Sequence, residues 1–290
     1  MYPLPLIKTE KLTHIYSPGT PFERVAIHDI DIALERGECL GIIGHTGSGK
    51  STFIQHLNGL LKPTSGHVYY DGHDIHESKQ RALETRFKVG LVFQYPEYQL
   101  FESTVSADIA FGPKNMGLGD SEIRERVQEA AGFAKLDDSL LEKSPFELSG
   151  GQKRRAAIAG VIAMRPEVLI LDEPTAGLDP SGRDEIITNI MSYKHAHNAT
   201  IIMVTHSMEE IAKTADRIVL FNKGHIELDD TPANVFAEVE RLSALGLSAP
   251  KASLVAARLR TLGLPVGRDI YTIGQLKAAL NEIKRGERRA

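Results

Sequence analysis

The sequence predicts an α/β protein, and three observations support this fold class. A short apolar run at 39–43 is followed by a glycine-rich turn and a helical pattern at 52–60, the order of a strand, a turn and a helix. Two later apolar runs, 168–171 and 201–204, each end in polar residues, as buried strands do at the ligand-binding edge of an open sheet. Most of 103–164 has helical spacing, and the chain turns to helices again after residue 231.

Antiparallel strands are predicted before the glycine-rich turn. Residues 7–16 and 25–34 alternate between apolar and polar side chains, with a loop rich in Pro and Gly between them. Tyr16 ends the first strand, where its ring is placed to stack on an adenine base; ordinary packing of the ring is an equally good interpretation. A further short strand at 67–70 leads into Asp71-Gly72, a hairpin signal.

The glycine-rich turn carries the strongest functional signal of the chain. It reads GHTGSGKS over Gly44–Ser51 and matches the phosphate-loop pattern G-x-x-x-x-G-K-[ST] at every fixed position. The glycines let the backbone curl so that its N–H groups point at phosphate oxygens, and the helix dipole adds to the attraction. Lys50 is expected to reach the outer phosphates of ATP, and the Ser51 hydroxyl to bind Mg²⁺. Nucleotide contacts are predicted from Gly44, His45, Thr46, Gly47, Ser48, Gly49, Lys50, Ser51 and Thr52.

Bulk composition excludes several classes of protein. The 290 residues are 42% hydrophobic and 25% charged, as in an ordinary globular protein. The net charge of −4 argues against broad nucleic-acid binding, which needs a basic face. Cys39 has no second cysteine to pair with, so we expect a buried thiol in a reducing cytosol. No apolar run approaches the roughly 18 residues of a membrane helix.

The apolar strand at 89–93 leads into a second candidate region. Gln94 follows it and is expected to face the ligand crevice, as a candidate catalytic residue and Mg²⁺ ligand. The next stretch, Tyr95–Phe101, places three aromatic residues and a leucine in a loop interrupted by Pro96. Either these side chains pack beneath the domain or they form a docking patch for a partner, and the sequence favours neither.

A second anion site is predicted at the start of a helix that runs to about Met164. Ser149, Gly150, Gly151 and Gln152 stand at its amino end, where unpaired N–H groups attract anions. The alternative is a simple capped helix. Two glycines make that alternative less natural, because each costs roughly 1 kcal/mol in a helix.

The strand at 168–171 ends in two carboxylates, which are costly beside an apolar run unless they meet a cation. We expect Asp172 to orient Mg²⁺ and Glu173 to act as the base that positions the attacking water. His206 follows the strand at 201–205, where its imidazole is placed to contact the γ-phosphate or to hold that water with Glu173. A solvated turn is the poorer interpretation of the two acids.

The chain is predicted to close with a hairpin at 218–228 and a small helical domain. Two helices in that domain have apolar faces by spacing. These faces consist of Val255, Leu259, Leu262 and Leu264 in one helix and Leu276, Ala279, Leu280 and Ile283 in the other. We therefore predict a nucleotide-binding domain at 1–230, with a helical subdomain at about 95–164, and a C-terminal helical domain at 231–290 that is a candidate for dimerisation.

Taken in order, the motifs resemble those of ABC-transporter ATPases over residues 1 to about 230. They are GHTGSGKS, Gln94, LSGGQ at Leu148–Gln152, LILDEP at Leu169–Pro174, AGLD at Ala176–Asp179 and His206. The resemblance implies a P-loop NTPase fold of the ABC type, with a mixed-sheet core, an antiparallel β subdomain and an α-helical subdomain. It also implies a composite site, in which the phosphate loop of this chain faces the LSGGQ of a partner and Ser149–Gln152 faces the partner's nucleotide.

Three further features resemble the energy-coupling factor transporters of prokaryotes: VFQYPEYQLF, IAFGPKNMG at Ile109–Gly117 and the helical tail. QYPEYQLF together with DEPTAGLD is similar to the second ATPase of that family. The resemblance implies a heterodimer with a homologous ATPase, at the cytoplasmic face of the cell membrane. A transmembrane scaffold would dock near Tyr98–Phe101, and interchangeable membrane subunits would capture vitamins or other micronutrients.

The resemblance also implies a mechanism and leaves alternatives. ATP that contacts both subunits binds the closed dimer better, and a preference of about 5.5 kcal/mol would swing its population from 1:99 to 99:1. Hydrolysis would then let the dimer open. The alternatives are an importer ATPase for cobalt or nickel, and a soluble ABC ATPase acting on ribosomes or DNA. A regulatory nucleotide binder without turnover is disfavoured because Lys50, Glu173 and His206 are all present.

Overall fold

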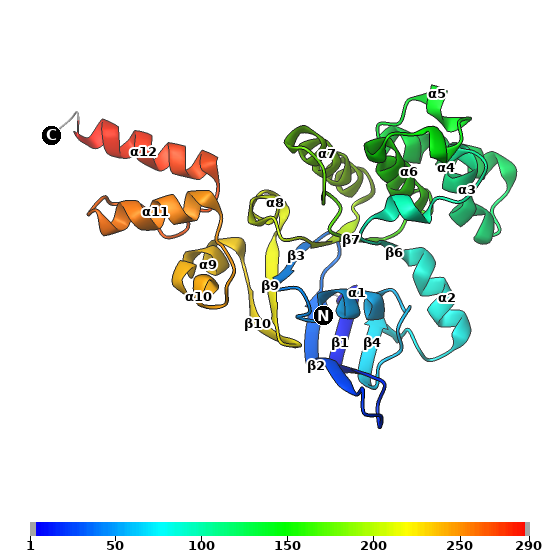
Figure 1. Ribbon diagram of the computed structural model, residues 1–290, viewed down its shortest axis with the longest axis horizontal. Coiled ribbons are helices and arrows are strands. Elements are labelled where there is room, and N and C mark those ends of the chain that lie inside the picture. The colour runs from blue at the N-terminus through cyan, green and yellow to red at the C-terminus, as the bar shows by residue number, and fades with distance from the viewer. Residues whose placement is uncertain (1–3, 288–290) are drawn as a thin grey trace. The chain divides into compact units, whose positions relative to one another are not determined.

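The computed structural model describes residues 4–287, which form two compact bodies (Figure 1). The first body holds residues 4–38 and 51–204, and the second holds 39–50 and 205–287. Within the described part of the chain, no helix combines the length and the apolar composition needed to cross a membrane.

An antiparallel sheet opens the first body, as the sequence predicts. Its strands are β1 (Ile7–Tyr16), β2 (Arg24–Leu34), β4 (Ser65–Tyr70) and β5 (His73–Asp74), in the order β2-β1-β4-β5. Asp71 and Gly72 both have positive φ, 49° and 77°, which is the backbone of a two-residue hairpin turn. The predicted hairpin is confirmed.

Three parallel strands form the buried layer of the first body: β6 (Val89–Val92), β7 (Val168–Asp172) and β8 (Thr200–Val204). β7 pairs with β6 on one side and β8 on the other, and every residue of the three strands is buried. Continuous apolar runs are typical of parallel strands covered on both faces. Asp172 ends β7 beside Val204, so the carboxylates follow the strand at the edge that the sequence predicts.

Helices make up the rest of the first body (Figure 1). They are α1 (Lys50–Leu57), α2 (Lys79–Lys88), α3 (Val105–Asn115), α4 (Asp120–Phe133), α5 (Asp138–Leu141), α6 (Gly150–Ile162) and α7 (Pro180–His197), with short 3₁₀ turns η1 (Pro96–Gln99) and η2 (Pro145–Glu147). The prediction of a helix at 52–60 is shifted: α1 starts two residues earlier and ends three residues earlier. Gly59 has φ +73°, which ends the helix and leaves Leu60 43% exposed.

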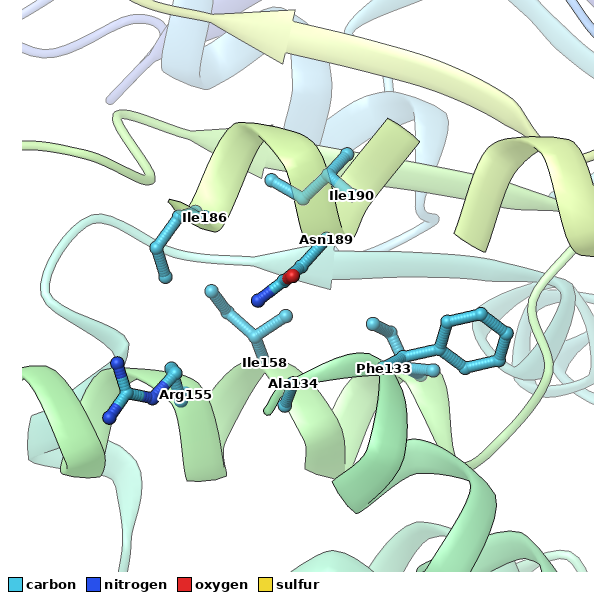
Figure 2. Close-up of a pocket in the computed structure, with 8 residues that line it drawn as sticks. Phe133, Ala134, Arg155, Ile158, Ile186, Asn189 and Ile190 are labelled. Atoms are coloured by element: carbon cyan, nitrogen blue, oxygen red, sulfur yellow. The ribbon is translucent and has the colours of Figure 1, made fainter. Parts of the chain in front are cut away.

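A small cavity of about 10 Å³ lies between the end of α4, α6 and α7. Apolar side chains line most of it, and two polar ones, Arg155 and Asn189, reach it from facing helices (Figure 2). Asn189 Nδ2 and Arg155 Nε are buried without a hydrogen-bond partner among residues 4–287. Unpaired buried donors of this kind cost free energy, so the cavity is a weak point in the packing of the first body.

The second body contains a mixed sheet of three strands. β3 (Cys39–Gly44) pairs in parallel with β9 (Arg217–Asn222), which pairs antiparallel with β10 (His225–Asp230) through the predicted hairpin. The thiol of Cys39 is fully buried, as expected. Helix α8 (Met208–Thr214) packs on β3. Gly41 has no side chain, and Ile211 of α8 fills the space that a side chain there would occupy.

The change from strand to helix falls at Thr231, where the sequence predicts it. Four helices follow: α9 (Pro232–Ala237), α10 (Val239–Ala244), α11 (Lys251–Thr261) and α12 (Ile273–Glu287). The face predicted for α11 is partly wrong. Val255 and Leu262 are 45% and 64% exposed, and Ala252 and Ala256 are buried instead. The helix buries its small residues there, and Leu259, Leu264, Leu276, Ala279 and Ile283 pack around them.

Candidate nucleotide-binding and catalytic site

The phosphate loop lies in the second body, between β3 and α1. Gly44, Gly47 and Gly49 have φ of +146°, +77° and +108°, conformations that side-chain-bearing residues rarely adopt. A side chain at Gly44 would also collide with the backbone of Phe221 in β9. The glycines of the motif are therefore required by the backbone itself, which confirms the strand, turn and helix predicted there.

Two further contacts fix the loop within the second body. The Gly224 N–H in the β9–β10 hairpin donates to the Ser48 carbonyl at 3.0 Å. The exposed imidazole of His45 hydrogen-bonds the Leu245 carbonyl just after α10. The phosphate loop thus contacts both the hairpin and the C-terminal helices, a link that the sequence pattern did not predict.

Lys50 curls over the loop that precedes it. Its ammonium group donates to the carbonyl oxygens of Gly44 at 2.7 Å and His45 at 2.8 Å, and the residue is only 7% exposed. A buried cation above a curled glycine loop suits an anionic phosphate ligand. The geometry fits the role predicted for Lys50.

Ser51 and Asp172 meet within the first body, although 121 residues separate them. The Ser51 hydroxyl donates to the Asp172 carboxylate at 3.1 Å, and Asp172 is 8% exposed. A hydroxyl and a carboxylate are the hard oxygen ligands that Mg²⁺ prefers, so this pair fits the metal predicted from the sequence. Thr52 follows in the first turn of α1.

The other predicted catalytic residues lie at strand ends. Glu173 follows Asp172 in a left-handed conformation, with φ 51°, and its N–H donates to the Val204 carbonyl at 2.8 Å. It is 9% exposed, so its carboxylate is held in a buried position. Gln94 is exposed two residues after β6, also in the first body. His206 is exposed in the second body, two residues after β8 ends.

Ser149 caps α6, as in the alternative that the sequence left open. Its hydroxyl accepts from the Gln152 N–H at 3.4 Å, and the Gln152 side chain accepts from the Ser149 N–H at 2.9 Å, which is a capping box. Gly150 and Gly151 have no positive φ, and a side chain at either would meet nothing within 4 Å among the described residues. The fold of this chain therefore gives no local reason for two glycines at this position.

Tyr16 is 40% exposed at the end of β1, with its hydroxyl 3.2 Å from the Thr52 hydroxyl. The ring packs edge-on against His14, with centroids 4.5 Å apart. The ring is therefore only half-covered by its own chain, and it reaches the first turn of the helix that follows the phosphate loop. Stacking on adenine stays a prediction.

The aromatic residues of 95–101 do not pack beneath the domain. Tyr95, Tyr98 and Phe101 are 44%, 85% and 59% exposed. A surface groove of about 320 Å³ runs beside them. It is lined by Phe87, Gln99, Leu100, Phe101, Asp108, Phe111, Gly112, Asn115, Ala156, Ala157, Gly160, Val161 and Met164. Of the two interpretations left open, the exposure favours a docking surface.

The sequence analysis missed three residues that support the predicted site residues: Arg154, His14 and His56. Arg154 in α6 forms a buried ion pair with Glu97 in η1, and the histidines His14 and His56 contact one another beneath Tyr16. The double arginine after LSGGQK was a visible signal for Arg154, but its partner lies 57 residues away. His14 and His56 had no signal, because a lone histidine in a strand or helix is ordinary.

Comparisons with known proteins agree with this geometry. The profile of the ABC transporter family matches residues 27–176. The energy-coupling factor transporter ATP-binding protein EcfA2 of Clostridium perfringens is 55% identical over 280 residues, which cover 96% of this chain and 98% of that protein. The protein of the same name from Clostridium tetani is 54% identical over 278 residues, which cover 96% of each chain. These relatives do not favour a cobalt or nickel importer or a soluble ABC ATPase.

Solved structures give the same result. The cbiO1 protein of Clostridium perfringens, part of the ABC transporter complex cbiONQ, superimposes with a TM-score of 0.74 at 39% identity, covering 89% of this chain and 98% of that chain. The ATP-binding cassette MJ0796, in a dimeric post-hydrolysis state bound to ADP and Pi, gives a TM-score of 0.71 at 27% identity, covering 78% and 98%. The chain therefore belongs to the ABC transporter family and, within it, to the energy-coupling factor transporter ATP-binding proteins, whose ATP hydrolysis is coupled to transport.

Proposed function

We propose that this chain pairs with a second, homologous ATPase and binds ATP with Mg²⁺ at composite sites between the two subunits. The phosphate loop and its neighbours form one half of a site, and the amino end of α6 completes the partner's site. Closure of the pair on ATP would drive a membrane scaffold, and hydrolysis would reset it.

The glycines at the start of α6 carry this proposal. Neither backbone conformation nor crowding within the chain calls for glycine at 150 or 151, yet each glycine weakens a helix. A phosphate group from outside the chain would call for them, because bare backbone allows close approach to the N–H groups of a helix start. In MJ0796, the bound ADP and Pi occur in a dimer.

We propose for the individual residues the roles that their sequence motifs predict. Lys50 and the N–H groups of Gly44–Ser51 would hold the phosphates, and Ser51, Asp172 and Gln94 would surround Mg²⁺, which screens the phosphate charge. Glu173 would take the proton of the attacking water, with His206 beside the γ-phosphate. Tyr16 would stack on adenine.

Membrane coupling would pass through the groove beside 98–101. Its floor is apolar and its rim carries exposed aromatic residues, as expected for the end of a membrane-protein helix. We place the chain at the cytoplasmic face of the membrane as a peripheral subunit, with scaffold and substrate-capture subunits that import vitamins or other micronutrients. Residues 231–290 would form a C-terminal domain that contributes to dimerisation.

Gly151→Asp tests the composite site. A carboxylate at this open position should leave folding and ATP binding by the isolated chain intact, and should lower ATP hydrolysis by the assembled complex more than tenfold, about 1.4 kcal/mol or more. Gly132→Asp is the matched control, because Gly132 is also helical and also has no neighbours within 4 Å. Wild-type hydrolysis by the Gly151→Asp complex would contradict the proposal.

Affinity purification tests the assembly. The tagged chain is recovered from detergent-solubilised native membranes, and its companions are identified by mass spectrometry. We expect a second ATPase, a hydrophobic scaffold and a further membrane subunit that identifies the substrate. Recovery as a soluble homodimer, or with ribosomes, would overturn the assembly proposed here.

A further inference from the structure

Four residues of the first body, Tyr16 among them, form a closed network of contacts. The Tyr16 hydroxyl lies 3.2 Å from the Thr52 hydroxyl, and the Thr52 carbonyl lies 2.7 Å from His56 Nδ1. His56 Nε2 lies 3.1 Å from His14 Nδ1. The His14 ring then packs edge-on against the Tyr16 ring, with centroids 4.5 Å apart and planes at 76°.

The two hydrogen bonds that His56 forms have a defined direction. The Thr52 carbonyl accepts only, so His56 Nδ1 carries a proton and donates it. A neutral His56 then has a bare Nε2, which accepts from His14 Nδ1–H. Burial lowers the pKa of His56 to about 4 and also lowers the pKa of His14, which keeps both rings neutral at pH 7.

One side of this network is buried and the other is exposed. His56 is fully buried, His14 is half-buried and Tyr16 is 40% exposed. A half-exposed tyrosine at a strand end, next to Ser17 with φ 50°, would otherwise sample several rotamers, and ordering it during binding would cost affinity. The two histidines remove that freedom and hold the tyrosine against the first turn of α1.

We propose that His14 and His56 are positioning residues for the nucleobase. They hold the Tyr16 ring at a fixed place beside α1, so that a base stacks on a preformed platform while the phosphates bind the loop before α1. Neither histidine contacts the phosphates. The inference rests on the proposed role of Tyr16 in ATP binding, and it assigns to the pair an effect on the base half of the ligand only.

Two ligands separate the base from the phosphates. The full-length chain is titrated calorimetrically with ATP and with inorganic tripolyphosphate, which lacks a base. His56→Asn retains a donor where Nδ1 stands but cannot reach His14. We expect it to weaken ATP binding roughly five- to tenfold, within the range measured for loss of aromatic stacking on a base, and to change tripolyphosphate binding less than twofold.

Further variants test the route through Tyr16. Tyr16→Ala should weaken ATP binding at least as much, and His56→Asn should add nothing in the Tyr16→Ala background, because the histidines act through that ring. His67→Asn, on the exposed β4–β5 hairpin, is the matched control and should bind both ligands normally. If His56→Asn does not fold, His14→Ala provides the same comparison at a less buried position.

The outcomes are distinct. Loss of ATP binding with tripolyphosphate binding preserved, and no additivity with Tyr16→Ala, supports the inference. Equal losses for both ligands would show damage to α1 and overturn it, as would full additivity in the double variant. If the wild-type chain failed to bind ATP, the proposed function itself would be overturned, whereas normal ATP binding by every histidine variant would overturn the positioning role alone.

Discussion

Arg154 and Glu97 form a buried, two-point ion pair. Arg154 Nε and Nη2 donate to the Glu97 carboxylate at 3.1 and 2.8 Å, with 3% and 15% of the two side chains exposed. The same guanidinium donates to the carbonyl of Ala176, three residues after Glu173. One arginine therefore joins the start of α6, the aromatic loop at 95–101 and the loop that follows the predicted catalytic base.

Arg154→Met should destabilise the protein strongly. Removing one partner of a buried pair leaves the other charge uncompensated and typically costs about 3–5 kcal/mol. Arg155→Met is the matched control, because Arg155 forms a more exposed pair with Glu185 at 3.3 Å, and we expect it to cost less than about 1 kcal/mol. Urea denaturation of both variants measures the difference, and equal costs would contradict the central role of Arg154.

Ser51→Ala should remove most of the gain in nucleotide affinity that Mg²⁺ provides. The Ser51 hydroxyl and the Asp172 carboxylate are 3.1 Å apart, and together they supply the oxygens that we assign to the metal. We expect ATP affinity to fall about tenfold with Mg²⁺ and to stay unchanged in EDTA, a difference of about 1.4 kcal/mol. An equal loss in EDTA would show that Ser51 serves the phosphates and not the metal.

Glu173→Gln should retain ATP binding and slow ATP hydrolysis. A positioned general base contributes roughly 10²–10⁴-fold to a rate, and glutamine matches the size of glutamate without its basicity. We expect the variant to keep the left-handed backbone at this position, because the N–H of residue 173 can still donate to the Val204 carbonyl. Single-turnover hydrolysis by the assembled complex measures the effect. Turnover at the wild-type rate would require another base.

Stability should fall as pH decreases from about 6.5 toward about 4. The folded chain holds the pKa of His56 at about 4 through burial, whereas the unfolded chain has the ordinary value of 6.5. Protons therefore bind the unfolded state more strongly, and protonation favours unfolding. The full loss is about 3 kcal/mol below pH 4, with none above pH 7. His56→Asn should flatten this part of the curve relative to the wild type, and parallel curves would contradict the assignment.

Asn189→Leu should stabilise the protein. The substitution removes a buried unpaired donor and fills part of the cavity in Figure 2 with an apolar side chain. We expect a gain of about 1 kcal/mol, which raises Tm by roughly 2–4 °C in a chain of this size. Asn189→Asp places a carboxylate in the same site and should lower Tm. Calorimetry on the two variants measures both shifts. A lower Tm for Asn189→Leu would contradict the interpretation that the unpaired Asn189 donor destabilises the protein.

Local pattern was enough to predict much of this protein. Strand, glycine turn and helix at 39–57 are encoded within 19 consecutive residues, because apolar spacing and glycine conformations act over short distances. The cap at Ser149 and the two acids at the end of β7 are local for the same reason. The limits of that reasoning show in α11, where spacing marked Val255 and Leu262 as core but the structure buries Ala252 and Ala256.

The sequence by itself therefore determined the α/β elements, the phosphate loop and the identity of the two acids at the end of β7. Only the tertiary structure decided which distant residues meet: Ser51 with Asp172, Arg154 with Glu97, and His14 with His56 beneath Tyr16. The physical reason is that backbone conformation depends on neighbouring residues. Contacts between side chains depend instead on which faces of separate strands and helices pack together, and no local pattern specifies that packing.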